Sequence, residues 1–266
     1  MKNVVVILGS PRKGDSYDVC TDIGEKLKLH DVSLEYIELS KMNIKFCRGC
    51  NQCFTKMPGT CPIEDDLDMI IERMKNADGL ILASPVYAYQ VTALMKNFFD
   101  RIAYMTHRPI IVQKPFMTVV TTVGGGIKET DSYMKLMGRS LGGTHVGSVS
   151  VKAPQYFKKN DFIQIYNHNY FIKTQKHLLY CCDVITKAIK SDIVKKPTVA
   201  DIFMFQAMKS KTYTSKVDYN YWAERGWLTQ SYYMEEGVGL YKKALGKATG
   251  WIIERMWKRM VGRKLV

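Results

Sequence analysis

The sequence lacks the long apolar segments that cross membranes. It has 266 residues, of which 46% are hydrophobic, yet no run of about 18 uncharged apolar residues occurs. The start, Met1 to Leu8, is a short apolar burst followed by Gly-Ser-Pro-Arg. It has no basic region, long apolar stretch or small-residue cleavage site of a secretory signal. We therefore expect no transmembrane helix and interpret these residues as the first strand of a cytoplasmic protein.

Several catalytic patterns are missing as well. The five histidines are scattered without metal-ligand spacing, and no Ser/His/Asp set or pair of carboxylates stands out. We treat the histidines as structural, with the reservation that His107 follows a predicted helix beside the candidate site. The sequence therefore predicts no catalytic side chain.

Acidic residues are scarce in the second half of the chain. The net charge is +14, and residues 150–266 hold 21 Lys and Arg against nine Asp and Glu, whereas residues 1–149 hold 18 against 16. Such a surface suits an anionic membrane, a nucleic acid or an acidic redox partner. A solvated basic surface is the simpler interpretation. We expect no nucleic-acid partner. For the basic C-terminal helix, contact with a membrane surface is less favoured than packing against the rest of the protein.

The cysteine count excludes a disulfide framework. Seven cysteines are an odd number, and four of them fall within 15 residues, as Cys47-Arg48-Gly49-Cys50-Asn51-Gln52-Cys53 and Cys61. This C-x₂-C-x₂-C-x₇-C spacing lets one loop wrap a [4Fe–4S] cluster. A Cys₄ zinc site and thiols without metal stay open as alternatives. We expect the other three cysteines, Cys20, Cys181 and Cys182, to be packing residues.

Apolar runs and amphipathic segments alternate from residue 3 to residue 151. Runs such as 3–8 are typical of parallel strands that are buried on both faces. We predict strands at 3–8, 34–39, 79–83, 116–122 and 145–151, and helices at 16–29, 65–76, 92–104 and 130–141. The alternation predicts an α/β fold with a doubly wound, five-stranded parallel sheet. Ligands of such sheets bind beyond the carboxyl ends of the strands.

The segment after the first strand has the features of a phosphate-binding loop. It reads Gly9-Ser10-Pro11-Arg12-Lys13-Gly14-Asp15-Ser16-Tyr17 and leads into a helix, whose free N–H groups suit a phosphate. Ser10 and Ser16 offer hydroxyl groups, and Arg12 adds positive charge. The segment has neither the Walker pattern nor the dinucleotide glycine pattern. The segment therefore predicts that an anion binds at the N-terminus of this helix.

Three loops together resemble the flavodoxin-like NADPH-dependent FMN reductase family. Besides the first loop, they are Ser84-Pro85-Val86-Tyr87-Ala88-Tyr89-Gln90 and Thr121-Thr122-Val123-Gly124-Gly125-Gly126. The resemblance implies a flavodoxin-like fold that binds FMN, with the flavin itself carrying the reaction. The residues that it implies for FMN are Ser10, Arg12, Ser16, Tyr17, Pro85, Val86, Tyr87, Ala88, Thr121, Gly124 and Gly125.

The cysteine loop, residues 47–61, resembles the iron–sulfur flavoprotein branch of that family. In that branch the cysteines follow strand two, and an acidic pair such as Asp65-Asp66 comes after them. The resemblance implies a [4Fe–4S] cluster on Cys47, Cys50, Cys53 and Cys61, electron transfer between cluster and FMN, and dimers or larger assemblies. Other family members resemble this chain in carrying a cysteine loop without a cluster.

The pattern changes after Pro154, so we predict a domain at 1–154 and an extension at 155–266. The extension is mainly helical, with helices at 168–190, 197–209 and 239–263, and residues 218–233 are rich in Tyr and Trp. We expect these aromatic residues to serve dimerisation or to cover the active site, rather than only to pack a core. The last helix places Ile252, Ile253, Met256, Trp257 and Met260 on one stripe, which we expect to dock on the protein.

The sequence therefore predicts an FMN-dependent oxidoreductase that takes electrons from NAD(P)H or a reduced ferredoxin. The alternative is an electron-carrying iron–sulfur flavoprotein without a small-molecule substrate. A basic binding protein that keeps flavin only as structure or sensor is the third reading, and nothing positive favours it. We also expect a homodimer or higher homo-oligomer and a ferredoxin-like redox partner.

Overall fold

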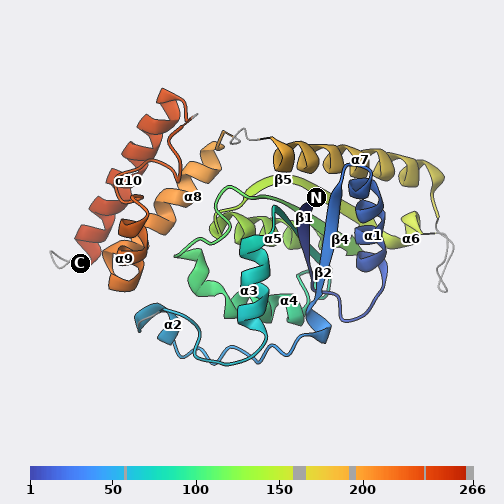
Figure 1. Cartoon of the computed structure of the whole chain (residues 1–266), viewed down its shortest axis with the longest axis horizontal. Helices are drawn as coiled ribbons and strands as arrows, with labels where there is room; N and C mark the ends of the chain where they lie inside the picture. The colour runs from blue at the N-terminus through green and yellow to red at the C-terminus, as the bar shows by residue number, and fades with distance from the viewer. Residues whose placement is uncertain (57–58, 158–165, 192–195, 237, 262–266) are drawn as a thin grey trace.

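The computed structural model describes residues 1–56, 59–157, 166–191, 196–236 and 238–261. Within these ranges the chain forms a central parallel sheet with helices on both faces, followed by a smaller group of helices at one side (Figure 1). None of the described helices is long and apolar enough to span a membrane.

The sheet has five parallel strands in the order β2-β1-β3-β4-β5. This is the order of a flavodoxin-like, doubly wound sheet, so the predicted fold class is confirmed. Each predicted strand exists, with ends displaced by about two residues or fewer. The strands are β1 (Lys2–Leu8), β2 (Val32–Glu38), β3 (Gly79–Pro85), β4 (Pro115–Thr122) and β5 (Thr144–Lys152).

Two apolar layers hold the sheet between its helices. Successive side chains of a strand point to opposite faces, so Val5 and Ile7 of β1 join one layer while Val4 and Val6 join the other. The first layer lies under α3 (Leu67–Asn76), α4 (Ala93–Arg101) and α5 (Ile127–Ser140). The second lies under α1 (Asp15–Lys28) and α7 (His168–Lys190).

Helix α7 comes after residue 154, where we predicted the extension to begin, yet it packs on the sheet. Leu178 and Ile185 are fully buried in the same layer as α1. Cys20, Cys181 and Cys182 are buried there too, as expected for packing residues, and burial raises the pKa of Cys182 to about 12. In packing terms, the separate C-terminal part starts after α7.

Four elements form this separate part, which we name the C-terminal unit: α8 (Val199–Lys209), η3 (Ser210–Tyr213), α9 (Lys216–Glu224) and α10 (Leu240–Val261). Its first helix begins at a complete capping box, in which the side chains of Thr198 and Asp201 each accept a backbone N–H of the other residue. The unit lies beside α5 and the short helix α2 (Gln52–Thr55) rather than on the sheet (Figure 1).

The aromatic residues of the C-terminal unit form its own core. Trp222 is fully buried, and its ring lies 5.1 Å from that of Phe205 and 5.5 Å from that of Trp227. Tyr232 and Tyr233 are buried beside them. We expected these rings to serve mainly dimerisation or an active-site cover. Most of these rings instead pack into this core, since the unit has no strand among its described residues to provide one.

Helix α10 docks through only part of the predicted stripe. Ile252 and Met256 of that stripe are 51 and 55% exposed, whereas Ile253 and Trp257 are partly buried. The contact is made by Gly246 and Gly250, where a Cβ would lie 3.0 Å from Ser231 Cβ and 2.6 Å from Gln206 Oε1, respectively. Small residues decide the docking because they let the helix approach α8 closely. The Met260 side chain and Arg263 lie outside the described residues.

The helix predicted over 92–104 is interrupted. Helix α4 ends at Arg101, and the 3₁₀ turn η2 (Ala103–Thr106) follows. Arg101 is buried and turns its guanidinium toward the cysteine loop. The remaining short elements are η1 (Leu39–Lys41) and α6 (Ala153–Tyr156).

Candidate functional site

The phosphate-binding loop leaves the first turn of α1 open to a ligand. Gly14 is the N-cap residue and has no side chain to cap the helix, and its carbonyl accepts a hydrogen bond from Asp18 N at 3.0 Å. Ser10 Oγ donates to the Arg12 carbonyl at 2.6 Å and so shapes the turn. The N–H groups of an uncapped helix start attract an anion.

Ser16 connects this loop to the end of β4. Its Oγ lies 2.5 Å from Thr121 Oγ1, and both side chains are buried. The hydroxyl pair lies at the bottom of the space between the two strand ends. It therefore fixes the spacing of the first and third loops.

The second loop is tied to both neighbours. Val86 N donates to the Thr121 carbonyl at 2.8 Å. Thr92, the N-cap of α4, donates its hydroxyl to the Gly9 carbonyl at 2.6 Å, and this threonine was not predicted. A Cβ at Gly9 would lie 2.8 Å from Met95 Cβ, so this approach requires glycine.

The tip of the second loop has a strained backbone. Ala88 and Tyr89 have φ of +46° and +63°, values that non-glycine residues rarely adopt. Two hydrogen bonds hold the tip, from Tyr87 N to Gln90 O and from Gln90 N to Tyr87 O, at 2.8 and 3.0 Å. Strain of this kind is typical of sites that bind ligands.

Gly126 lets the third loop pack under that tip. Its φ is +84°, and a Cβ there would lie 2.6 Å from Val86 Cγ1 and 2.9 Å from Tyr89 Cα. Gly126 is thus the glycine of the Gly-Gly-Gly run that the fold requires, whereas a Cβ at Gly124 meets no atom within 4 Å.

The three loops enclose one cavity of about 150 Å³. Seven of the residues predicted for FMN line it: Ser10, Arg12, Ser16, Pro85, Val86, Tyr87 and Thr121. The other lining residues are Gly14, Asp15, Thr122 and Val123. Burial, and then the nearby Asp18 carboxylate, raise the pKa of Asp15. The three loops, 9–17, 84–90 and 121–126, therefore form one edge of the sheet, which we name the flavin edge. It combines an uncapped helix start, hydroxyl groups and exposed aromatic side chains.

Four predicted residues are not among those lining the cavity. The Tyr17 ring packs against Tyr36, 5.3 Å between centroids, with Lys13 above it. Ala88 lies in the strained tip, and Gly124 and Gly125 are exposed in the third loop. Sequence reasoning also missed Gly126 and Thr92. Their role depends on loops that meet only in the fold, although Thr92 before an apolar helix is a readable N-cap signal.

The cysteine loop lies against α4. Cys47 N donates to Asn97 Oδ1 at 3.3 Å. Cys47 and Cys50 are exposed, whereas Cys53 and Cys61 are partly buried, and burial and then the neighbouring Cys61 raise the pKa of Cys53. Among the residues that the structure describes, no three His, Cys, Asp or Glu side chains are close enough to hold a metal ion.

A buried ion pair anchors the end of the cysteine loop. Arg101 Nη1 lies 2.6 Å from Asp65 Oδ2, and both side chains are fully buried. Arg101 also donates to the carbonyls of Lys45 and Ile63, on either side of the cysteines. Burial raises the pKa of Asp65, but hydrogen bonds from Arg101 and from the N–H groups of Lys45 and Leu67 outweigh it and hold that pKa low. The predicted acidic pair is thus structural, since Asp66 likewise accepts Asn43 N at 2.7 Å.

A second buried arginine joins the cysteine loop to the C-terminal unit. Arg108 donates to the carbonyls of Cys53 and Gly59 and pairs with Asp218 of α9, Nε to Oδ1 3.0 Å. A Cβ at Gly59, φ +82°, would lie 1.8 Å from Arg108 Nη1, so glycine makes this contact possible.

His107 completes this contact and does not line the flavin cavity. Its Nδ1 lies 2.9 Å from Asp218 Oδ2, and its ring lies 4.8 Å from that of Phe54. Trp222 Nε1 donates to the His107 carbonyl at 2.6 Å. The C-terminal unit therefore contacts the cysteine loop directly, and the reservation about His107 as an active-site residue finds no support in its position.

The fold and the three loops define a flavin-binding protein of the flavodoxin-like class. A sequence profile of the NADPH-dependent FMN reductase family matches residues 2–158, more than half of the chain. The chain belongs to this family. It is a flavin-dependent oxidoreductase that binds FMN.

The curated relatives are similar over much of the chain. An iron-sulfur flavoprotein of Archaeoglobus fulgidus is 30% identical over 84% of this chain and 99% of its own length. An iron-sulfur flavoprotein of Clostridioides difficile is 32% identical over 68% of this chain and 79% of its own. These names agree with the branch that the cysteine spacing resembles.

Solved structures share the fold at low sequence identity. An oxidoreductase of Corynebacterium diphtheriae has a TM-score of 0.53 and 17% identity, over 71% of this chain and 97% of that one. RosB, solved with 8-demethyl-8-formylriboflavin-5'-phosphate, has a TM-score of 0.55 and 10% identity, over 71% of this chain and 79% of that one. These likenesses establish the fold alone.

Proposed function

We propose that this oxidoreductase moves electrons between a reduced donor and an acceptor, with FMN at the sheet edge and a [4Fe–4S] cluster on the cysteine loop. The observation that carries the flavin assignment is the meeting of three loops at one cavity. When bound, FMN supplies hydride or single-electron chemistry. The protein's own groups bind and orient it.

Each part of the edge has a role in binding. The uncapped start of α1, with Ser10 and Arg12, suits the phosphate. The Ser16–Thr121 pair and Gly126 hold the loops at a fixed spacing for the ring. Tyr87 is 48% exposed and lines the cavity, so its ring is free to lie against a flat ligand.

The donor set of the cysteine loop fits an iron–sulfur cluster. Cys53 and Cys61 are already neighbours, and the exposed Cys47 and Cys50 precede them on the same loop. Two buried arginines, Arg101 and Arg108, lie against the loop and offset the negative charge of thiolates. Cys47, Cys50, Cys53 and Cys61 would hold the cluster.

The test is anaerobic purification with a visible spectrum and assays of iron and labile sulfide. We expect about one FMN and four iron atoms per chain. Cys53→Ser and Cys61→Ser are expected to lose iron and keep FMN, whereas Cys20→Ser, at a buried packing position, keeps both. Zinc in place of iron, or a flavin spectrum without metal, contradicts the cluster. Failure to bind FMN contradicts the whole proposal.

The same sample separates the two electron-transfer readings. Bleaching of the flavin by NADH or NADPH supports an enzyme that uses a nicotinamide donor. Bleaching by reduced ferredoxin alone supports the electron carrier, which takes no small-molecule substrate. The basic C-terminal half favours an acidic protein partner of this kind.

We also propose that a second copy of the chain covers the flavin edge. Tyr89 and Val123 are 73 and 78% exposed at the loop tips, and Phe46, which directly precedes the cysteine loop, is 79% exposed. Apolar side chains gathered at a binding edge are typical of interfaces. Light scattering is expected to give a dimer or larger assembly, and Phe46→Ser to weaken it. A monomer at all concentrations contradicts the assembly.

A further inference from the structure

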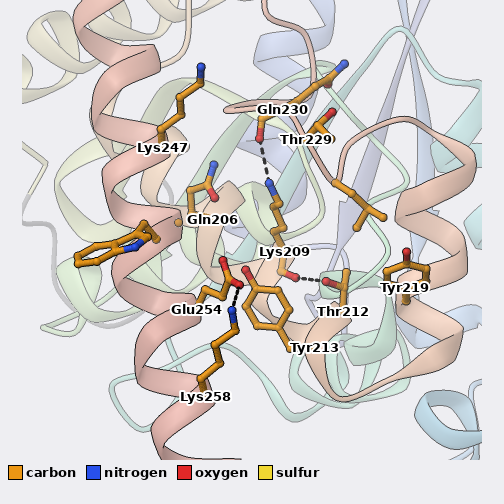
Figure 2. Close-up of a pocket in the computed structure, with 13 residues that line it drawn as sticks. Gln206, Lys209, Thr212, Tyr213, Tyr219, Thr229, Gln230, Lys247, Glu254 and Lys258 are labelled. Atoms are coloured by element: carbon orange, nitrogen blue, oxygen red, sulfur yellow. Dashed lines mark hydrogen bonds and ion pairs between the residues drawn. The ribbon is translucent and has the colours of Figure 1, made fainter. Parts of the chain in front are cut away.

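The C-terminal unit encloses a second cavity, apart from the flavin edge. It has a volume of about 730 Å³ and lies between α8, η3, α9 and α10 (Figure 2). None of its lining residues belongs to the flavin cavity or to the cysteine loop. Its size suits a small organic molecule.

Lys209 places a partly buried ammonium group in this cavity. Figure 2 shows it at the centre of the lining residues. Its Nζ donates to the Gln230 carbonyl at 3.2 Å, and in the part of the chain that the structure describes it forms no ion pair. An ammonium has three donors, so two are left for a ligand. Burial lowers the pKa of Lys209, and the nearby carboxylates of Glu254 and Glu235 offset this effect only in part. The protein around Lys209 therefore compensates its positive charge incompletely.

Two further lysines give the cavity an excess of positive charge. Both belong to α10: in the view of Figure 2, Lys247 lies above Lys209 and Lys258 lies below it. Glu254 contributes the negative charge, and it is paired with Lys258 at 2.5 Å. Three lysines face one glutamate, and a concave site lined mainly by one sign of charge concentrates ligands of the other sign.

The wall of the cavity also offers aromatic surface. Tyr219, which is 39% exposed, and the partly buried Tyr213 line it (Figure 2), whereas the exposed Trp251 ring carries the Arg255 guanidinium at 5.1 Å from its centroid. Gly250 precedes Trp251 and lines the cavity, and a Cβ there would lie 2.6 Å from Gln206 Oε1. Exposed rings beside lysines suit a ligand with a flat apolar body and an anionic group.

We propose that this cavity binds a small aromatic anion, with its phosphate or carboxylate on Lys209 and its ring against the tyrosines of the wall, Tyr213 and Tyr219. Lys247 strengthens the attraction from the rim. The site does not depend on FMN or on metal in the cysteine loop, so its failure and that of the proposed function are distinguishable.

The test is calorimetric titration of the FMN-loaded protein, which keeps the flavin phosphate site occupied. The probes are phenyl phosphate, benzoate and, as a neutral control, benzyl alcohol. We expect at least one anion to bind with Kd below about 1 mM and benzyl alcohol not to bind. The two anionic arms show whether the site prefers phosphate or carboxylate. No binding of either anion up to about 10 mM, or equal binding of benzyl alcohol, overturns the proposal.

Variants locate the site. Lys209→Met keeps the apolar stem and is expected to weaken binding about tenfold or more, as for a lost charge-assisted hydrogen bond. Lys247→Met, at the exposed rim, leaves the core untouched and is expected to weaken it severalfold. Lys176→Met, on α7, is the matched control and changes nothing. Affinity unchanged in both Lys209→Met and Lys247→Met overturns the site, and circular dichroism checks that each variant folds.

Discussion

The flavin edge and the cysteine loop both contact α4 but are built differently. The flavin edge consists of three loops that follow strand ends, and hydroxyl, backbone and glycine contacts join these loops to one another. The cysteine loop runs between β2 and α3 with one short helix. Two buried arginines, Arg101 and Arg108, hold it and form ion pairs with the buried carboxylates of Asp65 and Asp218.

This difference separates two kinds of stability. The loops of the flavin edge are held in place by the strands that they follow, and both faces of this sheet are buried. The cysteine loop depends on a few desolvated ion pairs, and such pairs are costly to break because they leave an uncompensated charge. We therefore expect single substitutions to detach the loop while the flavin edge persists.

The largest expected effect is that of Arg101→Met. It leaves Asp65 buried without a partner, and we expect a loss of about 3–5 kcal/mol in the free energy of unfolding. Urea unfolding measures it, and metal content reports on the loop. The control is Lys96→Met on the same helix, whose pair with Asp100 is about half exposed and contributes under about 1 kcal/mol. Equal losses of unfolding free energy in the two variants would contradict the view that the buried ion pair stabilises the cysteine loop.

Asp218→Asn tests the connection between the loop and the C-terminal unit. The carboxylate is fully buried between Arg108 and His107, so we expect a loss of about 2–4 kcal/mol in stability. We also expect faster modification of Cys53 by a thiol reagent in the metal-free protein. Glu224→Gln on the same helix, 74% exposed, is the control. An unchanged Cys53 reactivity would show that the loop is held without the C-terminal unit.

Gly126→Ala acts on the flavin edge alone. The positive φ and the 2.6 Å approach to Val86 Cγ1 predict a displaced loop and at least about tenfold weaker FMN binding. Quenching of flavin fluorescence measures this. Gly124→Ala meets no protein atom within 4 Å, so a loss of FMN in that variant reports direct contact between the flavin and residue 124. Metal content that falls together with FMN in Gly126→Ala would join the two regions into one.

The smallest effect is expected from Asp15→Asn. Asp15 lines the phosphate end of the cavity, where its carboxylate repels a phosphate, so we expect FMN to bind about two- to fivefold tighter. Because the pKa of Asp15 is raised, the gain is present above that pKa and disappears as the pH falls through it and Asp15 becomes neutral. Weaker binding in Asp15→Asn at neutral pH would indicate that the carboxylate contacts the ligand favourably.

Much of the fold followed from periodicity. Runs such as Val4–Leu8 have to be strands buried on both faces, and the alternation with helices leaves few topologies. Limits appeared where side chains decide the geometry. Helix α4 ends at Arg101, whose guanidinium donates to the carbonyls of Lys45 and Ile63 on either side of the cysteines. Ile252 and Met256 of the predicted α10 stripe stay exposed, because Gly246 and Gly250 make the closer contact.

The candidate site was predictable to a similar extent. Ser10, Ser16 and Thr121 were found because a loop after a buried strand is a recognisable signal, and the structure places all three at one cavity. Thr92 and Gly126 were missed because their contacts cross from one loop to another. Arg108 and Asp218 carried no signal, since neither stands in a motif.

The sequence by itself determined the layered sheet, the three flavin loops and the presence of four clustered cysteines. These are local properties, set by hydrophobic periodicity and by the residues that follow each strand. The tertiary structure alone decided how the cysteine loop is held, that the aromatic residues of the C-terminal unit are buried, and that Lys209 faces a cavity. The physical reason is that the partners of a buried charge are its neighbours in space. These neighbours come from segments far apart in the sequence, and no periodic sequence pattern connects them.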